Sequence, residues 1–398
     1  MRSNDSSISL KGCFIWSLCV FFFLYEFLLR TLVGTFQISL MNEFEISLLK
    51  YSILSTSGYL IIHCVMQIPS GILVNIFGLK KVLFIAALVC GFSSIGFAST
   101  SMYSLALFFR IMTAMGASVV FVALIIVILE WMPNKYFAFI LGVSQFIGTL
   151  GPLIAAGPVN SLLEHSSFGW RDVMFFLGIV GLVLSIFIFI FVKNKPETTG
   201  IFRIIQRPVK IRDTLKKVLT SRQIWYISIF SAMAYFSIEY LSENDGIQFL
   251  HLKGFSLNLS SYMISSTWLG YAIGCPLVGF ISDYFQRRKF ILITGAIVNA
   301  LSMAVIIYLP NGILNITCFF LLGVGASSIN ISFAMIAEHL KAGYNAIGIS
   351  FTNGMLAFFG AFNAPCLAYL IEISDKVQEA PLLQDYRFAF SFLLLALI

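Results

Sequence analysis

Charge is scarce in this chain of 398 residues, and long apolar stretches are abundant. Only 11% of the residues are charged, against roughly 25% in an ordinary soluble domain. In contrast, 59% are hydrophobic, and phenylalanine alone occurs 41 times. A soluble protein of this length could not bury so much apolar surface, whereas a lipid bilayer can solvate it. The composition therefore excludes a soluble globular protein and predicts an all-α membrane protein.

Several signatures of chemistry are also missing. The sequence contains no CxxC pair, no HExxH sequence and no Ser-His-Asp pattern, and its seven cysteines all fall in apolar stretches. Such cysteines are typical of small buried hydrophobic residues, so we expect no metal site, no cofactor and no disulfide framework. The absence of a P-loop argues against ATP-driven transport. The sequence thus favours a protein that is not an enzyme.

Apolar stretches of helical length follow one another along the whole chain. A membrane-spanning helix needs about 20 residues, and eleven stretches meet this length convincingly. The twelve stretches lie at about 13–38, 51–77, 82–98, 102–129, 136–159, 173–192, 224–241, 260–282, 290–309, 313–337, 346–371 and 386–398. The last begins with Tyr386-Arg387, as the sixth begins near Trp170-Arg171, but it is shorter. We therefore predict twelve transmembrane helices, with the last one truncated.

One loop sequence occurs twice. Pro276–Lys289 is an apolar helix end that runs into a basic turn, and Pro69–Lys81 is a weaker copy of it. Pairs of similar residues lie 208 positions apart: Gly71 and Gly279, Asn75 and Asp283, Lys80 and Arg288, Glu130 and Glu338, Tyr136 and Tyr344, Gln145 and Asn353. A repeat at half the chain length predicts two pseudo-symmetric six-helix bundles, residues 1–192 and 223–398, joined by a basic linker at 193–222.

The formal charge of +7 has a topological explanation. Of the 25 Lys and Arg residues, 18 lie in the N-terminal segment, in the linker or in loops on that same side of the predicted helices. Cytoplasmic loops of membrane proteins carry such an excess, so we expect both termini in the cytoplasm and the linker near anionic lipid headgroups. This distribution argues against a nucleic-acid partner.

Four sequence features resemble one family, the major facilitator superfamily of secondary transporters. The first is the loop motif Gly-x-x-x-Asp-x-x-Gly-x-Arg/Lys, with Asn75 and Gln286 as single departures in its two copies. The second is Arg110 followed by Gly116, and the third is Phe168-Gly-Trp-Arg171. The fourth is a partial helix-five motif made of Gly148, Gly151, Pro152, Gly157 and Pro158. The resemblance covers the whole chain and implies two bundles that rock around a central cavity.

The resemblance also implies a latch on the cytoplasmic side that forms in the outward-open state. Glu130 would pair with Lys80 or Lys81, and Glu338 with Arg287 or Arg288. The candidate gating residues are Gly71, Asn75, Lys80, Lys81, Glu130, Gly279, Asp283, Arg287, Arg288 and Glu338. Because Asn75 replaces an acid, we expect the first of the two latches to be the weaker one.

Charged residues inside the predicted helices are the candidates for the transport site, since such charges usually pair or line a cavity. Glu26 and Arg30 share one helical face and either face the cavity or neutralise each other. Arg110 has no acid at i±3 or i±4, so it needs a substrate carboxylate or an acid from another helix. Glu239 and Glu243 also share a face. They either hold a substrate amine or a proton, or lie in water outside the membrane.

The sequence predicts a secondary transporter of a small polar organic solute, coupled to protons and working by alternating access. The candidate substrate-binding residues are Tyr25, Glu26, Arg30, Arg110, Gln145, Glu239, Glu243 and Asn353. The pattern of Tyr25, Glu26, Arg30 and Arg110 resembles the branch of the family with bacterial phagosomal amino-acid transporters and lysosomal dipeptide transporters. This resemblance favours an amino acid or short peptide as the substrate. An organic-anion or sugar-acid:proton symporter and a non-transporting receptor are the alternatives. We expect a monomer in a bacterial inner membrane.

Overall fold

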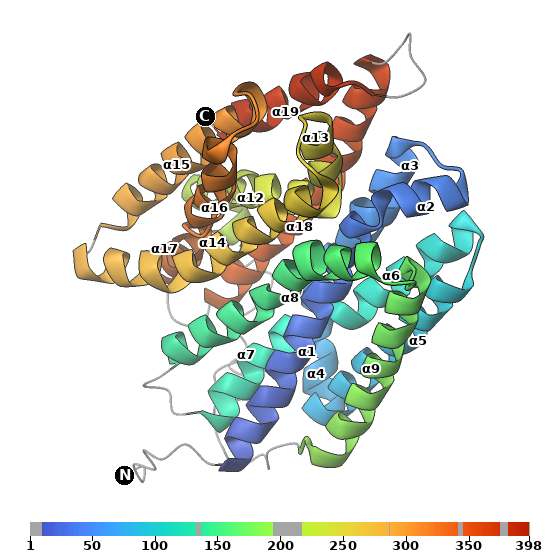
Figure 1. Cartoon of the computed structure of the whole chain (residues 1–398). Coiled ribbons are helices and arrows are strands. Elements are labelled where there is room, and N and C mark those ends of the chain that lie inside the picture. The colour runs from blue at the N-terminus through green and yellow to red at the C-terminus, as the bar shows by residue number, and fades with distance from the viewer. Residues whose placement is uncertain are drawn as a thin grey trace, which may run out of the picture.

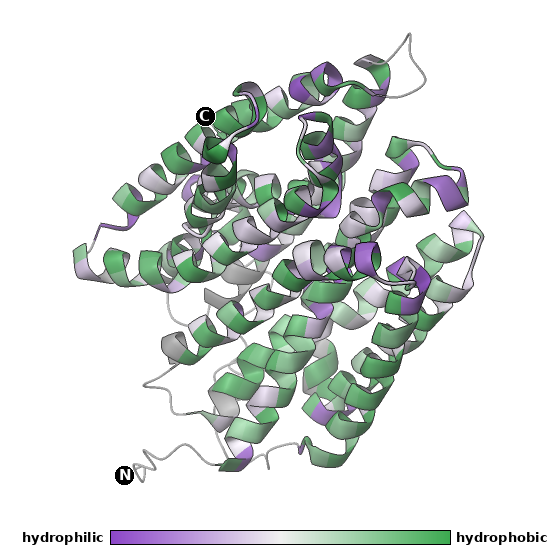
Figure 2. Ribbon diagram, viewed as in Figure 1, coloured by the Kyte–Doolittle hydropathy of each residue, from purple (hydrophilic) through white to green (hydrophobic). Residues whose placement is uncertain are grey.

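Helices account for the architecture wherever the computed structural model describes the chain, which is at residues 10–132, 137–193, 217–285, 287–340, 345–374 and 381–397. Within these ranges, eleven helical segments of 20 to 26 residues are long and apolar enough to cross a membrane. Hydrophobic residues run along the helices, and hydrophilic ones gather near many helix ends (Figure 2). The protein is therefore an integral multi-pass membrane protein.

The helices form two groups that follow the two halves of the sequence (Figure 1). The first group contains α1 (Leu10–Thr35), α2 (Gln37–Phe44), α3 (Leu48–Ser52), the π-helical turn η1 (Ile53–Ser57), α4 (Gly58–Phe77), α5 (Leu79–Ser99), α6 (Tyr103–Ala117), α7 (Val120–Trp131), α8 (Phe137–His165) and α9 (Trp170–Phe191). The second contains α12 (Arg222–Glu243), α13 (Gly246–Leu252), α14 (Leu257–Phe285), α15 (Arg288–Tyr308), α16 (Ile313–Ala326), α17 (Ile329–His339), α18 (Asn345–Ser374) and α19 (Leu383–Leu397). Most of the predicted linker 193–222 lies outside the described residues, so the domain boundaries stay a prediction.

The same interruption occurs in both halves. The predicted continuous spans 102–129 and 313–337 are each broken by a two-residue turn, at 118–119 and at 327–328, which are 209 positions apart. At each break a serine hydroxyl donates a hydrogen bond back to the preceding turn, Ser118 to the Met115 carbonyl and Ser327 to the Val324 carbonyl. Serine side chains that bond the backbone in this way compete with helical geometry, which the apolar pattern alone does not predict.

Close helix packing is also repeated. A Cβ atom added at Gly116 would lie 2.7 Å from the carbonyl oxygen of Ala86, and one added at Gly325 would lie 2.9 Å from that of Gly295. Both pairs are related by an offset of 209 positions. Gly116 lies in the fourth span and contacts the third, and Gly325 lies in the tenth span and contacts the ninth. The two halves therefore pack equivalent helices through equivalent glycines.

Two arginines play equivalent roles near the starts of the sixth and twelfth helices. Arg171 in α9 donates to the carbonyl of Thr100 at the end of α5, and Arg387 in α19 donates to the carbonyl of Ile307 in the last turn of α15. These bonds satisfy carbonyls that a helix end leaves unpaired. Together with the eleven long spans and the repeated breaks and glycine contacts, they agree with the predicted twelve-helix fold of two pseudo-symmetric bundles, in which the twelfth helix, α19, has 15 described residues.

The two halves meet most closely at one end of the molecule, which we call the distal end. It is the end at which α1 terminates and near which α2, α3 and α13 lie (Figure 1). There a Cβ atom on Gly34 would lie 1.9 Å from the carbonyl oxygen of Ser242. The side chain of Gln37 donates a hydrogen bond of 2.5 Å to Asp245. Both residues of each pair are buried, so the distal end is sealed.

These two contacts locate the pseudo-two-fold axis. Gly34 and Ser242 are 208 positions apart, and so are Gln37 and Asp245. Residues that are equivalent under a two-fold rotation can touch each other only where the axis passes between them. The axis of the repeat therefore runs through the seal at the distal end, between α1–α2 and α12–α13.

Candidate functional site

An ion-pair cluster joins the two halves beneath the distal seal. Arg30 of α1 pairs through Nε with Glu243 Oε1 at 2.7 Å and through Nη2 with Glu239 Oε1, both acids belonging to α12. The three side chains are almost completely buried. Their four-residue spacing places the two acids on one face of α12, as predicted, and that face is packed against α1. In this conformation the two acids are therefore buried against α1 rather than in contact with water.

Glu26 has a different partner from the one that the sequence suggested. Its carboxylate accepts a hydrogen bond of 2.7 Å from the Tyr59 hydroxyl of α4. Arg30, one turn away on α1, instead directs its guanidinium to the acids of the other half. Local spacing allowed a Glu26–Arg30 pair, but the two carboxylates of α12 compete successfully for the same cation.

Arg110 lies in the first half and bonds to backbone carbonyls. It donates to the carbonyls of Leu29, Arg30 and Ser55 at 2.8, 2.6 and 2.9 Å. The Tyr59 ring lies under its guanidinium at 4.6 Å, and its Nε is buried without a hydrogen-bond partner. Arg110 thus ties α1 to the π-helical turn η1 rather than pairing with an acid. A direct contact with substrate stays a prediction.

Aromatic residues that the sequence did not single out surround Arg30. The rings of Phe27 and Tyr235 lie 5.9 and 6.0 Å from its guanidinium carbon, and Trp268 packs edge-on against both rings. Trp268 also donates through Nε1 to the Ser242 hydroxyl at 2.6 Å. Among so many aromatic residues, no local sequence signal distinguishes these three, because α1, α12 and α14 bring them together.

The cluster carries an unbalanced charge. Glu26, Glu239 and Glu243 oppose only Arg30 and Arg110, so the group has a net charge of −1 when every member is ionised. Uncompensated charge in a buried site is strongly unfavourable. The arrangement can therefore accept one proton or one cation without leaving an excess positive charge.

Three other predicted residues do not take part in this cluster. The Tyr25 hydroxyl donates to the Leu177 carbonyl of α9 at 2.8 Å, so its side chain points into the first half. Gln145 of α8 and Asn353 of α18 are half-buried, and the ion pairs and hydrogen bonds described above do not involve them. Their roles in substrate binding stay predictions.

The helix-five motif brings α8 close to its neighbours. A Cβ atom on Gly148 would meet the Phe23 ring, and one on Gly151 would lie 2.5 Å from the Leu24 carbonyl oxygen, both on α1. Farther along, the Ser265 hydroxyl of α14 bonds the Leu153 carbonyl and the Gly157 amide of α8, each at 2.7 Å. Pro152 and Pro158 lie in the same helix. Close packing explains the glycines, and Ser265 adds a bond between the halves.

Half of the predicted latch residues, including both glutamates, have side chains outside the described part of the structure. No side-chain placement is described for Asn75, Glu130, Asp283 or Glu338, and the surroundings of Gly71 are likewise undescribed. A Cβ on Gly279 would have no described atom within 4 Å. The latch therefore stays a prediction.

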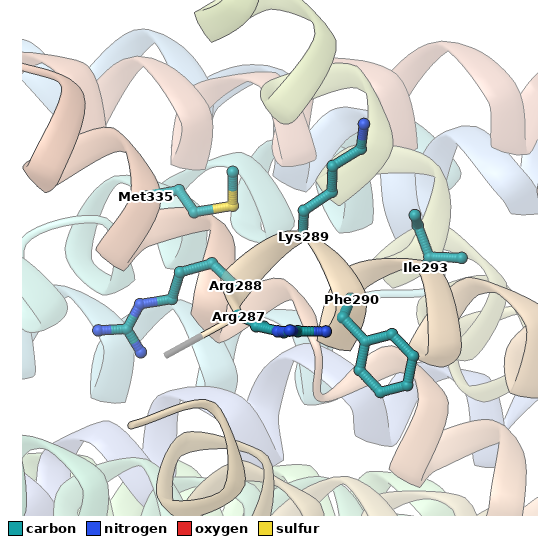
Figure 3. A pocket seen from close by; sticks show the side chains of 6 residues that line it. All are labelled: Arg287, Arg288, Lys289, Phe290, Ile293 and Met335. Carbon is teal, nitrogen blue, oxygen red and sulfur yellow. The ribbon is translucent and has the colours of Figure 1, made fainter. Parts of the chain in front are cut away.

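The basic residues of the latch are described, and they do not converge on one point. Arg287, Arg288 and Lys289 line a shallow pocket of about 590 Å³ with apolar neighbours, and the Arg288 and Lys289 side chains point in different directions (Figure 3). In the first half, Lys80 lies 4.7 Å above the Phe189 ring, and Lys81 is exposed. This geometry is unlike that of a site for one small anion.

We expect the distal seal to depend on pH through the carboxyl of Asp245. Burial raises the pKa of its carboxyl to about 6, although hydrogen bonds from Tyr240 and Gln37 lower the pKa. An exposed Asp titrates near pKa 3.9, so the sealed conformation binds the proton more tightly than an open one. We expect the seal to weaken as pH rises from about 4 to 6 and to change little above that.

This pH dependence can be followed with spin labels at Asn42 and Ser256, two exposed distal positions in opposite halves, after replacement of the seven native cysteines. The population with a longer inter-label distance should grow between pH 4 and 6. In Asp245→Asn the distances should be independent of pH. A pH dependence that survives this substitution would assign the effect to another group.

Comparisons with known proteins agree on the family. A family model for the Major Facilitator Superfamily matches residues 18–365. The chain is 26% identical over 245 residues to the hexuronate transporter of Bacillus subtilis (strain 168), covering 58% of this chain and 55% of that protein. It is 24% identical over 263 residues to the cis,cis-muconate transport protein of Acinetobacter baylyi (strain ATCC 33305 / BD413 / ADP1), covering 61% and 60%. The chain thus matches less than two thirds of the length of these curated relatives.

Solved structures share the fold over nearly the whole chain. A bacterial homologue of the human lysosomal transporter Spinster, in an inward-facing and unoccupied conformation, has a TM-score of 0.79 at 12% identity and covers 98% of this chain and 95% of that one. A D-xylose-proton symporter has a TM-score of 0.77 at 18% identity, with 98% and 97% covered. At these identities the likeness concerns the fold alone.

Proposed function

Because the chain belongs to the Major Facilitator Superfamily of membrane transporters, we propose that it moves a small organic anion together with protons by alternating access. The two curated relatives are named for a hexuronate and for cis,cis-muconate, which are both carboxylates. They favour the organic-anion alternative. The preference for an amino acid or short peptide gains no support from them.

The observation that carries this proposal is the coordination of Arg30. Its guanidinium, at the interface of the two halves, is held by the carboxylates of Glu239 and Glu243. Guanidinium groups match carboxylates geometrically and bind them through paired hydrogen bonds. Arg30 is thus a carboxylate-binding site occupied by the protein's own acids, and a substrate carboxylate would compete with them for it.

Charge balance links this exchange to protons. The cluster already has a net charge of −1, and a bound carboxylate would bring it to −2 in a buried site. One proton taken up by Glu239 or Glu243 restores the original charge and releases a carboxylate from Arg30. Since buried unpaired charge is so unfavourable, we expect at least one proton to accompany each carboxylate.

The position of the cluster supports alternating access. Arg30 and the two glutamates bridge the halves next to the distal seal. When a substrate carboxylate replaces a glutamate on Arg30, an ion pair that joins the two halves there is lost. With both termini in the cytoplasm, as predicted, the sealed end is the outer one and the conformation is closed to the outside. The structural neighbour with a TM-score of 0.79 is also described as inward-facing, which supports this interpretation.

Uptake into proteoliposomes tests the proposal. Glucuronate, as a hexuronate, or cis,cis-muconate should enter with a measurable flow of protons in the same direction. In Glu243→Gln, where the cluster is neutral before the anion binds, fewer protons should accompany each anion. Glu43→Gln is the matched control, because Glu43 forms an exposed ion pair with Arg171 and should leave the ratio unchanged.

Other outcomes would point elsewhere. Uptake of amino acids or dipeptides without uptake of either anion would contradict the anion proposal and support the amino-acid or peptide substrate that the sequence favoured. A proton-to-anion ratio that is the same in Glu243→Gln would exclude the cluster as the coupling site. Binding of an anion without any uptake would favour the receptor alternative.

A further inference from the structure

The second span begins with an unusual turn. Residues Ile53–Ser57 form the π-helical turn η1 between α3 and α4. Single π-helical turns are rare in helices and often occur at functional sites. Here the turn lies at the interface between the halves, with three consecutive hydroxyl side chains, Ser55, Thr56 and Ser57, all buried. Its position and its bonds suggest a role beyond helix geometry.

Asn244, which belongs to the other half, is hydrogen-bonded to this turn. Its Nδ2 donates to Thr56 Oγ1 at 2.7 Å, and its Oδ1 accepts from Ser55 Oγ at 2.7 Å. Asn244 is buried and follows directly after α12, which ends with the glutamate that pairs with Arg30. Both ends of one amide are thus used by two neighbouring residues of η1.

The same turn is bonded to Arg110 on its other side. The Ser55 carbonyl accepts a hydrogen bond of 2.9 Å from Arg110 Nη2. A π-helical turn shifts backbone pairing by one residue relative to an α-helix, and this changes where its carbonyls point. The register of η1 therefore decides whether the Ser55 carbonyl can reach the guanidinium.

We propose that Asn244 is a positioning residue that holds residues 53–57 in the π-helical register while the distal end is sealed, and so keeps the Ser55 carbonyl on Arg110. When the halves separate at the distal end, Asn244 moves away with α12. The turn then relaxes to α-helical register, and Arg110 loses one of its three carbonyl acceptors. One N–H of Nη2 then becomes available to the anion while the other stays on the Arg30 carbonyl, a last step that rests on the proposed function.

This mechanism couples the seal to a cation in the first half without a direct contact between them. Asn244 does not touch Arg110 in the described bonds; Ser55 lies between them, bonded to one through its hydroxyl and to the other through its carbonyl. One residue thus connects a contact between the halves with the availability of a guanidinium. This also gives a reason for both N–H groups of Arg110 Nη2 to be bonded to carbonyls in a sealed conformation.

Amide hydrogen exchange of the purified full chain in lipid nanodiscs tests the register without any ligand. In Asn244→Ala the peptide that covers residues 52–58 should exchange at least several-fold faster than in the native chain. Two control variants each remove a single bond between the halves, whereas Asn244→Ala removes two. Gln37→Ala removes the bond to Asp245, and Ser57→Ala removes the 2.6 Å bond to the Ala361 carbonyl. Neither control should accelerate exchange in 52–58 as strongly.

A second arm measures anion affinity with glucuronate and cis,cis-muconate as probes. Asn244→Ala should tighten binding several-fold, and this gain should vanish in an Arg110→Lys background, since the coupling runs through the guanidinium. Asn244→Asp, which keeps the acceptor and loses the donor, should fall between the native chain and Asn244→Ala. If Asn244→Ala does not fold, the double change Ser55→Ala/Thr56→Val removes the same bonds from the other side.

The two arms separate this proposal from the transported substrate. Equal exchange in Asn244→Ala and Gln37→Ala would overturn the role of Asn244 in the register, whatever the protein transports. An affinity change that persists in Arg110→Lys would overturn the coupling to Arg110. Failure of both probes to bind would count against the proposed anion substrate, while the exchange result would still decide the role of Asn244.

Discussion

Replacement of Arg30 by alanine should abolish transport. The substitution leaves Glu239 and Glu243 buried next to each other without a cation, and the loss of one partner from a buried ion pair typically costs about 3–5 kcal/mol. It also removes the proposed binding group for the substrate carboxylate. We expect uptake of glucuronate or cis,cis-muconate to fall to background, together with a clear decrease in the thermal unfolding temperature of the purified protein.

The stability and transport effects of Arg30 can be separated. In the triple variant Arg30→Ala/Glu239→Gln/Glu243→Gln the buried acids are neutral, so much of the thermal stability should return. Transport should not return, because no guanidinium is left at this position. Recovery of uptake in the triple variant would mean that Arg30 serves only to neutralise the acids and that the anion binds elsewhere.

Replacement of Gly34 by alanine should hold the distal end open. The added Cβ would lie 1.9 Å from the Ser242 carbonyl oxygen and 2.8 Å from the Glu243 Cα, both backbone atoms of the other half. Backbone cannot move aside as a flexible side chain can, so α1 and α12 must separate. Spin labels at Asn42 and Ser256 should report a longer distance than in the native protein, and transport should stop.

The clash in Gly34→Ala lies between the halves, so each bundle should still fold. Thermal unfolding should remain cooperative, and the yield of the variant should be similar to that of the native chain. Gly142→Ala in α8 is the matched control, because among the described residues no atom lies within 4 Å of a Cβ at this position. Native inter-label distances and native uptake in Gly34→Ala would mean that the backbone at the seal can shift to accept the methyl group without opening of the distal end.

The sequence predicted the features that repeat or that obey helical periodicity. The 208-residue offset predicted two equivalent bundles, and the structure repeats both the serine breaks and the glycine contacts. The four-residue spacing of Glu239 and Glu243 placed both acids on one face. Asp and Gly are residue types that favour turns, and α12 ends at Glu243, just before the dipeptide Asp245-Gly246.

The partners of the charged residues in the site could not be predicted from the sequence alone. Glu26 and Arg30 satisfy the local rule for a pair, but the relative rotation of α1 and α12 decides where the guanidinium points. For the same reason Tyr59 and Asn244 were missed, since each acts on a residue far away in the chain. The π-helical turn also escaped prediction, because its apolar and hydroxyl residues are compatible with an ordinary α-helix.

The pseudo-two-fold axis at the distal end limits which residues could have formed the seal before the two halves were joined in one chain. In a dimer of two identical half-length chains, a residue on the axis would face its own copy, Gln against Gln or Asp against Asp. Two buried aspartates would repel each other. Fusion of the halves into one chain lets the two copies differ, so that Gln37 can donate to Asp245. In such a dimer every substitution would change both copies of a residue at once, whereas in the fused chain a substitution changes one residue of the pair. The strength of the seal can therefore evolve one mutation at a time.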